Sequence, residues 1–78
     1  MIRKIMPQLA AELMGKNPQF IRIGLQRNLL PFGNAIALSD NGRKKRYSYY
    51  ISPKLFMDYT GLTEKEILEV AKAKGYAI

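Results

Sequence analysis

The sequence lacks the residues on which many active sites and small folds depend. Among its 78 residues there is no cysteine, no histidine and no tryptophan. Without cysteine no disulfide can hold the fold, and without cysteine and histidine the common zinc sites and the nucleophilic Cys-His and Ser-His-Asp sites cannot form. Glu12, Asp40 and Asp58 lie in three different predicted elements, and no phosphate-cradling glycine loop is present. We therefore expect a protein that is not an enzyme and that uses no metal and no cofactor.

Long apolar runs are also absent. No stretch approaches the roughly 18 to 20 apolar residues that cross a bilayer. Residues 1–6 include two basic side chains but lack the apolar region and the small-residue cleavage site of a signal peptide. The missing cysteines agree with a reducing compartment. We expect a cytoplasmic protein with no membrane partner.

The excess positive charge lies entirely in the first sixty residues. The formal net charge is +7, of which residues 1–60 carry ten basic and three acidic side chains, while residues 61–78 carry three of each. A charge distribution this uneven suits a polyanionic partner such as a nucleic acid. The alternative is a basic surface that serves solubility alone.

Two short helices joined by a tight connection are predicted near the N-terminus. Apolar residues recur at helical spacing over residues 7–14, and Gly15 can end that helix in the left-handed conformation. Asn17 and Pro18 supply an N-cap and a first-turn proline for a second helix, which Asn28 can end. A three-residue connection forces the two helices to pack at a steep angle, as in a helix-turn-helix.

A β-hairpin is predicted next in the chain. The pair Asn41-Gly42 lies between two β-prone runs and favours a two-residue type I′ turn. That turn would place Ile36 opposite Tyr47, and the alternation of the second strand would turn Tyr50 outward. The face expected to enter the core carries Tyr47, Tyr49 and Ile51.

Two further helices complete an α+β fold. Ser52-Pro53 begins a short helix, and Thr63 with Glu66 forms a capping box that begins a last one. The expected architecture is a small winged helix-turn-helix: two N-terminal helices, a β-hairpin wing, a short helix and an extra C-terminal helix. Residues 1–61 form this domain, and residues 62–78 form an amphipathic helix packed on it or extending it.

One side of the second helix carries side chains suited to base pairs. Arginine binds guanine O6 and N7, glutamine matches adenine N6 and N7, and an isoleucine can meet a thymine methyl group. The predicted base-reading residues, spaced i, i+3, i+4, i+7, are Gln19, Arg22, Ile23 and Gln26. The alternative is the ordinary solvated side of a surface helix.

Four consecutive cations, residues 43–46, favour the DNA interpretation. Adjacent like charges do not stabilise the folded state, whereas they bind the phosphates of DNA whatever its base sequence. The predicted phosphate-binding residues are Lys16, Asn17, Arg27, Arg43, Lys44, Lys45 and Arg46. Tyr50 is a further predicted DNA contact. The tyrosines also suggest stacking on single strands, but their period-2 spacing makes most of them strand residues facing the core.

The segments Leu9–Arg22 and Leu29–Gly33 resemble the excisionase family, and their layout is similar to the wider MerR-type winged helix-turn-helix superfamily. The similarity covers roughly residues 5–60. This sequence departs from the usual pattern at Lys16 and Asn17, which replace Val-Ser, and at Asn28, which replaces an exit glycine. The matching motifs, in order, are Met14-Gly15, Ile21-Arg22, Leu30-Pro31, Tyr49-Tyr50-Ile51 and Ser52-Pro53.

The resemblance implies a bacterial phage or mobile-element protein, bound at the nucleoid, that recognises double-stranded DNA, bends it and directs a tyrosine recombinase (integrase) towards excision. Self-association on DNA belongs to the same expectation. The C-terminal helix either completes the core or contacts the recombinase or a neighbouring protomer. The alternatives are a transcription regulator with the same fold, an RNA-binding module, and a protein inhibitor that acts through the C-terminal helix.

Overall fold

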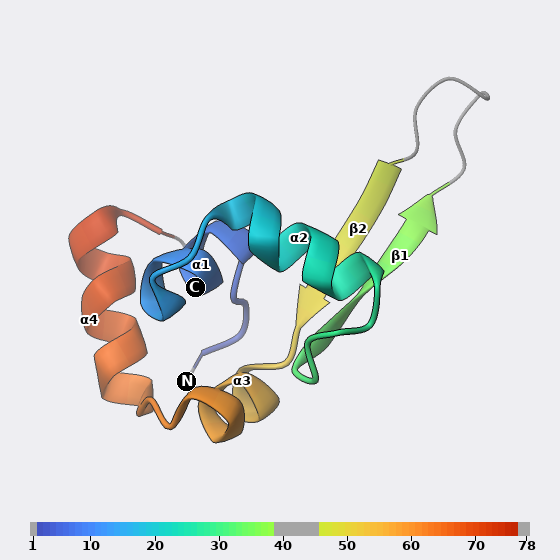
Figure 1. The fold of residues 1–78 in the computed structure, drawn as a ribbon. Coiled ribbons are helices and arrows are strands. Elements are labelled where there is room, and N and C mark those ends of the chain that lie inside the picture. The colour runs from blue at the N-terminus through green and yellow to red at the C-terminus, as the bar shows by residue number, and fades with distance from the viewer. Residues whose placement is uncertain (1, 39–45, 77–78) are drawn as a thin grey trace.

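Four helices and one antiparallel hairpin follow one another in the computed structural model, which describes residues 2–38 and 46–76 (Figure 1). The predicted α+β class and order of elements are confirmed. The hairpin projects away from the helices, and α4 lies on the opposite side of the molecule. The elements are α1 (Pro7–Met14), α2 (Pro18–Gln26), β1 (Gly33–Leu38), β2 (Arg46–Ile51), α3 (Pro53–Thr60) and α4 (Glu64–Lys74).

The ends of the first two helices follow from local sequence. Gly15 ends α1 at φ 67°, in the left-handed region that suits glycine. The Asn17 side chain accepts a hydrogen bond of 2.8 Å from the backbone N–H of Gln19, which satisfies a donor at the start of α2. Asn28 has φ 56° beyond the other end of α2. All three predictions are confirmed.

The caps of the last two helices also agree with the sequence. The Ser52 hydroxyl accepts from the backbone N–H of Leu55 at 3.3 Å. The Thr63 hydroxyl accepts from the N–H of Glu66, while the Glu66 carboxylate accepts from the N–H of Thr63 at 3.0 Å. This reciprocal pair is the predicted capping box.

The capping box predicts a dependence of stability on pH. The backbone N–H and then the hydroxyl of Thr63, by donating to the carboxylate, lower the pKa of Glu66 below its ordinary value of 4.5. A lowered carboxyl pKa contributes stability that is present above the unfolded-state pKa and is lost as the pH falls through the folded-state pKa. We therefore expect the melting temperature of Glu66→Gln to fall less than that of the wild type when the pH is lowered from about 5 to about 2.

The matched control is Glu69→Gln, which changes an exposed glutamate of the same helix. The melting temperature is measured at each pH by thermal unfolding followed by circular dichroism. In this control it should fall with pH as much as in the wild type. Equal losses in wild type and Glu66→Gln would contradict a stabilising role for the ionised carboxylate.

The register of the hairpin differs by one residue from the prediction. Ile36 pairs with Ser48, and Ala37 pairs with Tyr47. The prediction that Ile36 faces Tyr47 is therefore wrong. A one-residue shift moves a strand's side chains to the other face of the sheet, so Ile36 is 58% exposed. The second strand keeps its expected orientation, because Tyr49 is half-buried and Ile51 is buried.

Packing explains this register better than turn chemistry does. Ala35 lies opposite Tyr49, and Ala37 lies opposite Tyr47, so each ring has a small neighbour. Gly33 lies opposite Ile51, where an added Cβ would overlap the carbonyl oxygen of Tyr50. Only glycine fits this close approach of the two strands. The Asn41-Gly42 pair, from which the predicted register was taken, lies outside the described residues.

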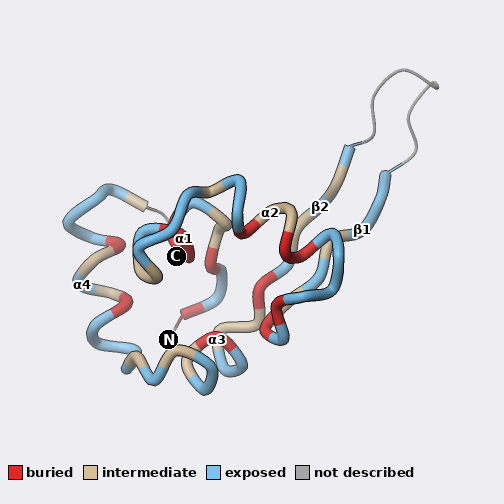
Figure 2. The backbone as a smooth tube through the Cα atoms, viewed as in Figure 1, coloured by how far each residue is buried: buried red, intermediate tan, exposed pale blue. Residues whose placement is uncertain are grey.

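The hydrophobic core collects side chains from all four helices and from the base of the hairpin (Figure 2). Phe32 is completely buried, with its ring centroid 5.0 Å from that of Phe56 in an edge-to-face contact. Ile67 and Ala71 bring α4 into the same core. The core consists of Ile2, Ile5, Leu9, Ala10, Ala11, Ile21, Leu25, Leu30, Phe32, Ile51, Phe56, Ile67 and Ala71.

None of the helices in residues 2–38 and 46–76 is long and apolar enough to cross a membrane.

Candidate nucleic-acid interface

Helix α2 has a buried side and a polar side. Its buried residues are Ile21, Gly24 and Leu25, as the sequence predicted. Gly24 leaves room for a leucine of the following loop, because an added Cβ would lie 2.7 Å from the Cδ1 atom of Leu30. The absence of a side chain at this position therefore lets the chain after α2 fold back onto the helix.

The four predicted base-reading residues all lie outside the core. Gln19 and Gln26 are exposed, and Arg22 and Ile23 are half-buried. Their helical spacing places them along one side of α2 over about two turns. The chemistry available on that side is one guanidinium group, two amides and one branched aliphatic group.

The hairpin lies beside the C-terminal end of α2 (Figure 1). The Gln26 side-chain amide Nε2 donates a hydrogen bond of 2.7 Å to the hydroxyl of Tyr49 on β2. The alternation of side chains along the second strand predicted that Tyr49 faces the core and predicted no partner for its hydroxyl. The ring does pack against the core, and the polar tip reaches α2, as the amphipathic character of tyrosine allows.

The described phosphate-binding candidates are exposed. Lys16 precedes α2, with its Nζ 5.4 Å from the ring centroid of Phe20. Arg27 follows the last residue of α2, and Arg46 begins β2. Within the described part of the chain, none of these three cations forms an ion pair, whereas Lys74 pairs with Glu12 at 3.2 Å. Their charges are therefore available to an anionic partner.

Not every predicted contact lies together. Tyr50 is 56% exposed, as expected. It shares the outer face of the hairpin with Arg46, whereas Tyr49 faces α2, so Tyr50 points away from the predicted base-reading residues. Asn17 is occupied as the N-cap of α2. Three predicted phosphate contacts, Arg43, Lys44 and Lys45, lie outside the described residues.

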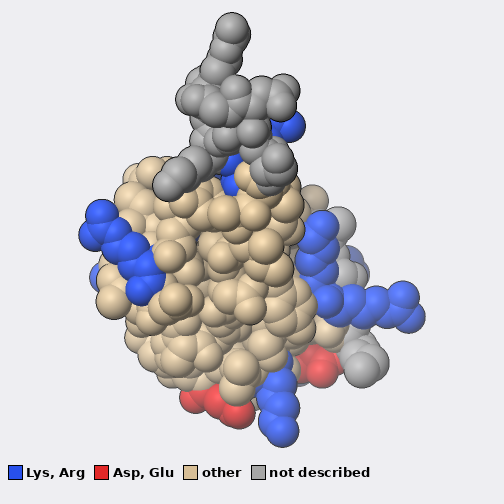
Figure 3. All heavy atoms as spheres, turned by 90° about the vertical axis from the view of Figure 1, so that its right-hand side faces the viewer, with Lys and Arg blue, Asp and Glu red and all other residues tan. Residues whose placement is uncertain are grey.

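Charge is unevenly arranged on the side of the molecule that carries the hairpin (Figure 3). Lysine and arginine side chains project around a largely uncharged centre, and the acidic side chains lie along the lower edge of this view. The described cations thus surround this side of the molecule and do not form one continuous patch.

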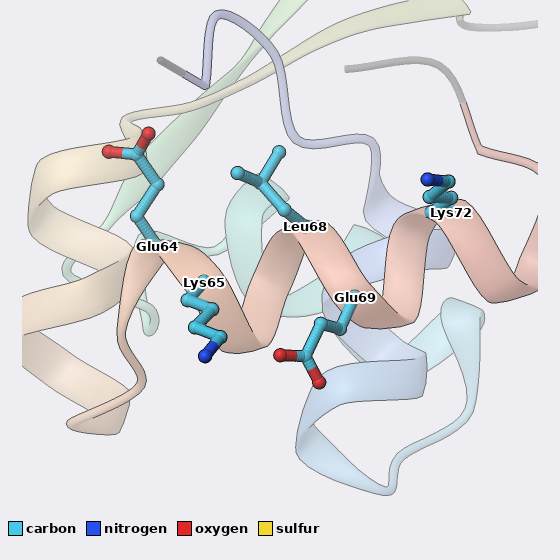
Figure 4. A pocket seen from close by; sticks show the side chains of 5 residues that line it. All are labelled: Glu64, Lys65, Leu68, Glu69 and Lys72. Carbon is cyan, nitrogen blue, oxygen red and sulfur yellow. The ribbon is translucent and has the colours of Figure 1, made fainter.

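The described surface also has a shallow hollow of about 350 Å³ on α4 (Figure 4). All its lining side chains come from that one helix, and both charge signs are present. The lining residues are Glu64, Lys65, Leu68, Glu69 and Lys72. The described residues contain no cluster of acidic side chains that could hold a metal ion. The polar side of α2 is therefore the stronger candidate site.

Comparisons of the chain with protein-family models, with curated proteins and with solved structures give no match, and the resemblance to excisionases stays a prediction from the sequence.

Proposed function

We propose that the protein is a winged helix-turn-helix that binds double-stranded DNA sequence-specifically, with α2 as the recognition helix and the β1–β2 hairpin as the wing. The observation that carries the proposal is the polar side of α2. Arg22 and the two glutamines, Gln19 and Gln26, stay outside the core, and the hairpin lies beside the same helix.

The dimensions and the chemistry agree with this assignment. A major groove about 12 Å wide admits an α-helix, and its base pairs present distinct patterns of donors and acceptors. Arginine and glutamine are the side chains that bind guanine and adenine edges with two hydrogen bonds. Lys16 and Arg27 flank α2 at its two ends, where phosphates border the groove.

A competition assay tests the proposed class of ligand. A fluorescently labelled DNA duplex is bound to the protein and then displaced by unlabelled duplex, by structured RNA and by single-stranded DNA. We expect the duplex to compete best, because the major groove of A-form RNA is too deep and narrow for side chains to read. Stronger competition by RNA would overturn the proposal in favour of an RNA-binding module.

Arg27→Ala should weaken binding to all duplex sequences about equally. Arg27 is exposed at the end of α2 and forms no ion pair with another described residue, so its expected contact is a phosphate. Losing one phosphate contact should reduce the slope of log K against log salt concentration by about one. Binding measured by anisotropy over a range of salt concentrations gives both quantities.

Lys72→Ala is the matched control for this measurement. It also removes one exposed cation, but from α4, away from the hairpin. We expect Lys72→Ala to keep the wild-type salt slope. An equal reduction in both variants would mean that net charge alone, and not a contact at α2, controls binding.

The finer proposal is an excisionase that acts with a tyrosine recombinase, and its support is the sequence resemblance over residues 5–60. A recombination assay with the recombinase, with and without this protein, tests it. Excision that depends on the protein is the expected result. Duplex binding without any effect on excision would favour the transcription regulator with the same fold.

A further inference from the structure

One hydrogen bond joins the proposed recognition helix to the hairpin. The Gln26 amide Nε2 donates to the Tyr49 hydroxyl at 2.7 Å, although the two residues are 23 positions apart in the sequence. Gln26 is itself exposed and belongs to the predicted base-reading side of α2. The bond therefore acts directly on a side chain that the proposed function assigns to DNA.

The position of the Tyr49 hydroxyl is fixed by its ring. The ring is half-buried and packs against the hydrophobic core. The Tyr47 ring lies 6.2 Å from it, centroid to centroid, and Ala35 lies opposite it on β1. A tyrosine ring has only two side-chain torsions, so packing on these sides leaves the hydroxyl little freedom. Tyr49 therefore offers the flexible Gln26 side chain a hydrogen-bond acceptor at a fixed position.

The bond leaves Gln26 able to contact a base. A glutamine amide has two N–H donors and one carbonyl acceptor, and only one N–H is donated to Tyr49. The carbonyl oxygen and the second N–H remain, and an amide oxygen with the N–H on its own side matches the N6 donor and the N7 acceptor of adenine.

We propose that Tyr49 is a positioning residue for base selection, because its hydroxyl holds the Gln26 amide in place before DNA binds. The inference rests on the proposed function of α2. Ordering a long side chain costs free energy at the moment of binding, and a side chain that is already held avoids part of this cost. The effect is expected at the one base pair that Gln26 contacts.

Tyr49→Phe tests the proposal, because it removes the hydroxyl and keeps the ring. Sites are selected from a random duplex pool by the wild type, and each base pair of the selected site is then varied in turn. We expect the preference of Tyr49→Phe for the selected base to fall about threefold to tenfold at one base pair, which is the effect of losing one neutral hydrogen bond. The preferences at the other base pairs should stay at their wild-type values.

Two further variants make the result specific. Tyr47→Phe makes the same chemical change on the same face of β2, at a hydroxyl with no hydrogen-bond partner among the described residues, and should keep the wild-type preferences. Gln26→Ala should lose preference at the same base pair as Tyr49→Phe. A double variant with Gln26→Ala and Tyr49→Phe should lose no more there than Gln26→Ala alone.

The outcomes separate the two levels of the hypothesis. A wild-type protein that enriches no duplex sequence overturns the proposed function and the inference together. A wild type with a clear preferred site, and a Tyr49→Phe variant with the same preferences at every base pair, overturns the inference alone. Nuclear magnetic resonance of the Gln26 side-chain amide reports the bond without DNA, and its signals should shift in Tyr49→Phe and not in Tyr47→Phe.

Discussion

Replacing Phe32 with alanine is expected to remove most of the protein's stability, so that much of the chain is unfolded at about 37 °C. The Phe32 side chain is completely buried, with edge contacts to Phe56 at 5.0 Å and to Tyr59 at 5.3 Å between ring centroids. Truncating a buried phenylalanine to alanine costs about 3 to 5 kcal/mol. A small domain has only about 5 kcal/mol of stability or a little more.

Phe20→Ala is the matched control, since it makes the same change at a phenylalanine that is 47% exposed. Urea denaturation followed by circular dichroism measures both variants. We expect Phe20→Ala to lose about 1 kcal/mol or less, because only partial burial and a weak contact with Lys16 are removed. Equal losses in the two variants would mean that Phe32 is not at the centre of the core.

The second large effect concerns Arg22. Arg22→Ala should weaken binding to the preferred duplex by about 1 to 3 kcal/mol, which is about fivefold to more than a hundredfold, and should relax the base preference at one position. The reason is the loss of the guanidinium group, which can bind guanine O6 and N7 together. Anisotropy titrations with the preferred duplex and with single-base variants of it measure both effects.

Arg3→Ala is the control for Arg22→Ala. Arg3 is exposed, whereas Arg22 is half-buried, and Arg3 belongs to the N-terminal segment, which runs between α1 and α3 and outside α2 and the hairpin (Figure 1). The control should bind the preferred duplex nearly as well as the wild type and with the same base preference. Unchanged selectivity in Arg22→Ala would mean that α2 is not the recognition helix.

The helix ends could be predicted from the sequence because they depend on neighbouring residues. Asn17, Ser52 and Thr63 each accept a hydrogen bond from a backbone N–H two or three residues further on. Gly15 takes the positive φ that other residues avoid. Interactions of such short range do not depend on the rest of the fold.

The hairpin register could not be predicted in the same way. It depends on which side chains of β1 meet the rings of β2, and these contacts join residues that are distant in sequence. Gly33 carries a signal that the predicted register left out: a glycine at the start of a strand marks a close approach of two backbones. Pairing Gly33 with Ile51 gives the observed register.

Parts of the core and of the candidate site were missed for a similar reason. Ile2 and Ile5 are buried, although the pattern of residues 1–6 predicted only that they are not a signal peptide. The alternation of side chains along β2 correctly predicted that the Tyr49 ring faces the core. It could not predict that the hydroxyl bonds to Gln26 on α2. Only the packing of α2 against the hairpin brings the two together. The signal available in the sequence was the polar tip of an inward-facing tyrosine, which requires a partner.

The most direct test of the proposed DNA-binding surface is a nuclear magnetic resonance titration of the full chain with a short DNA duplex. We predict that the amide signals that shift belong to α2, above all Gln19, Arg22 and Gln26, and to the neighbouring hairpin. The signals of α4, including Lys65 and Lys72, should stay unchanged. Shifts centred on α4, with α2 unaffected, would contradict the assignment of α2 as the helix that binds DNA.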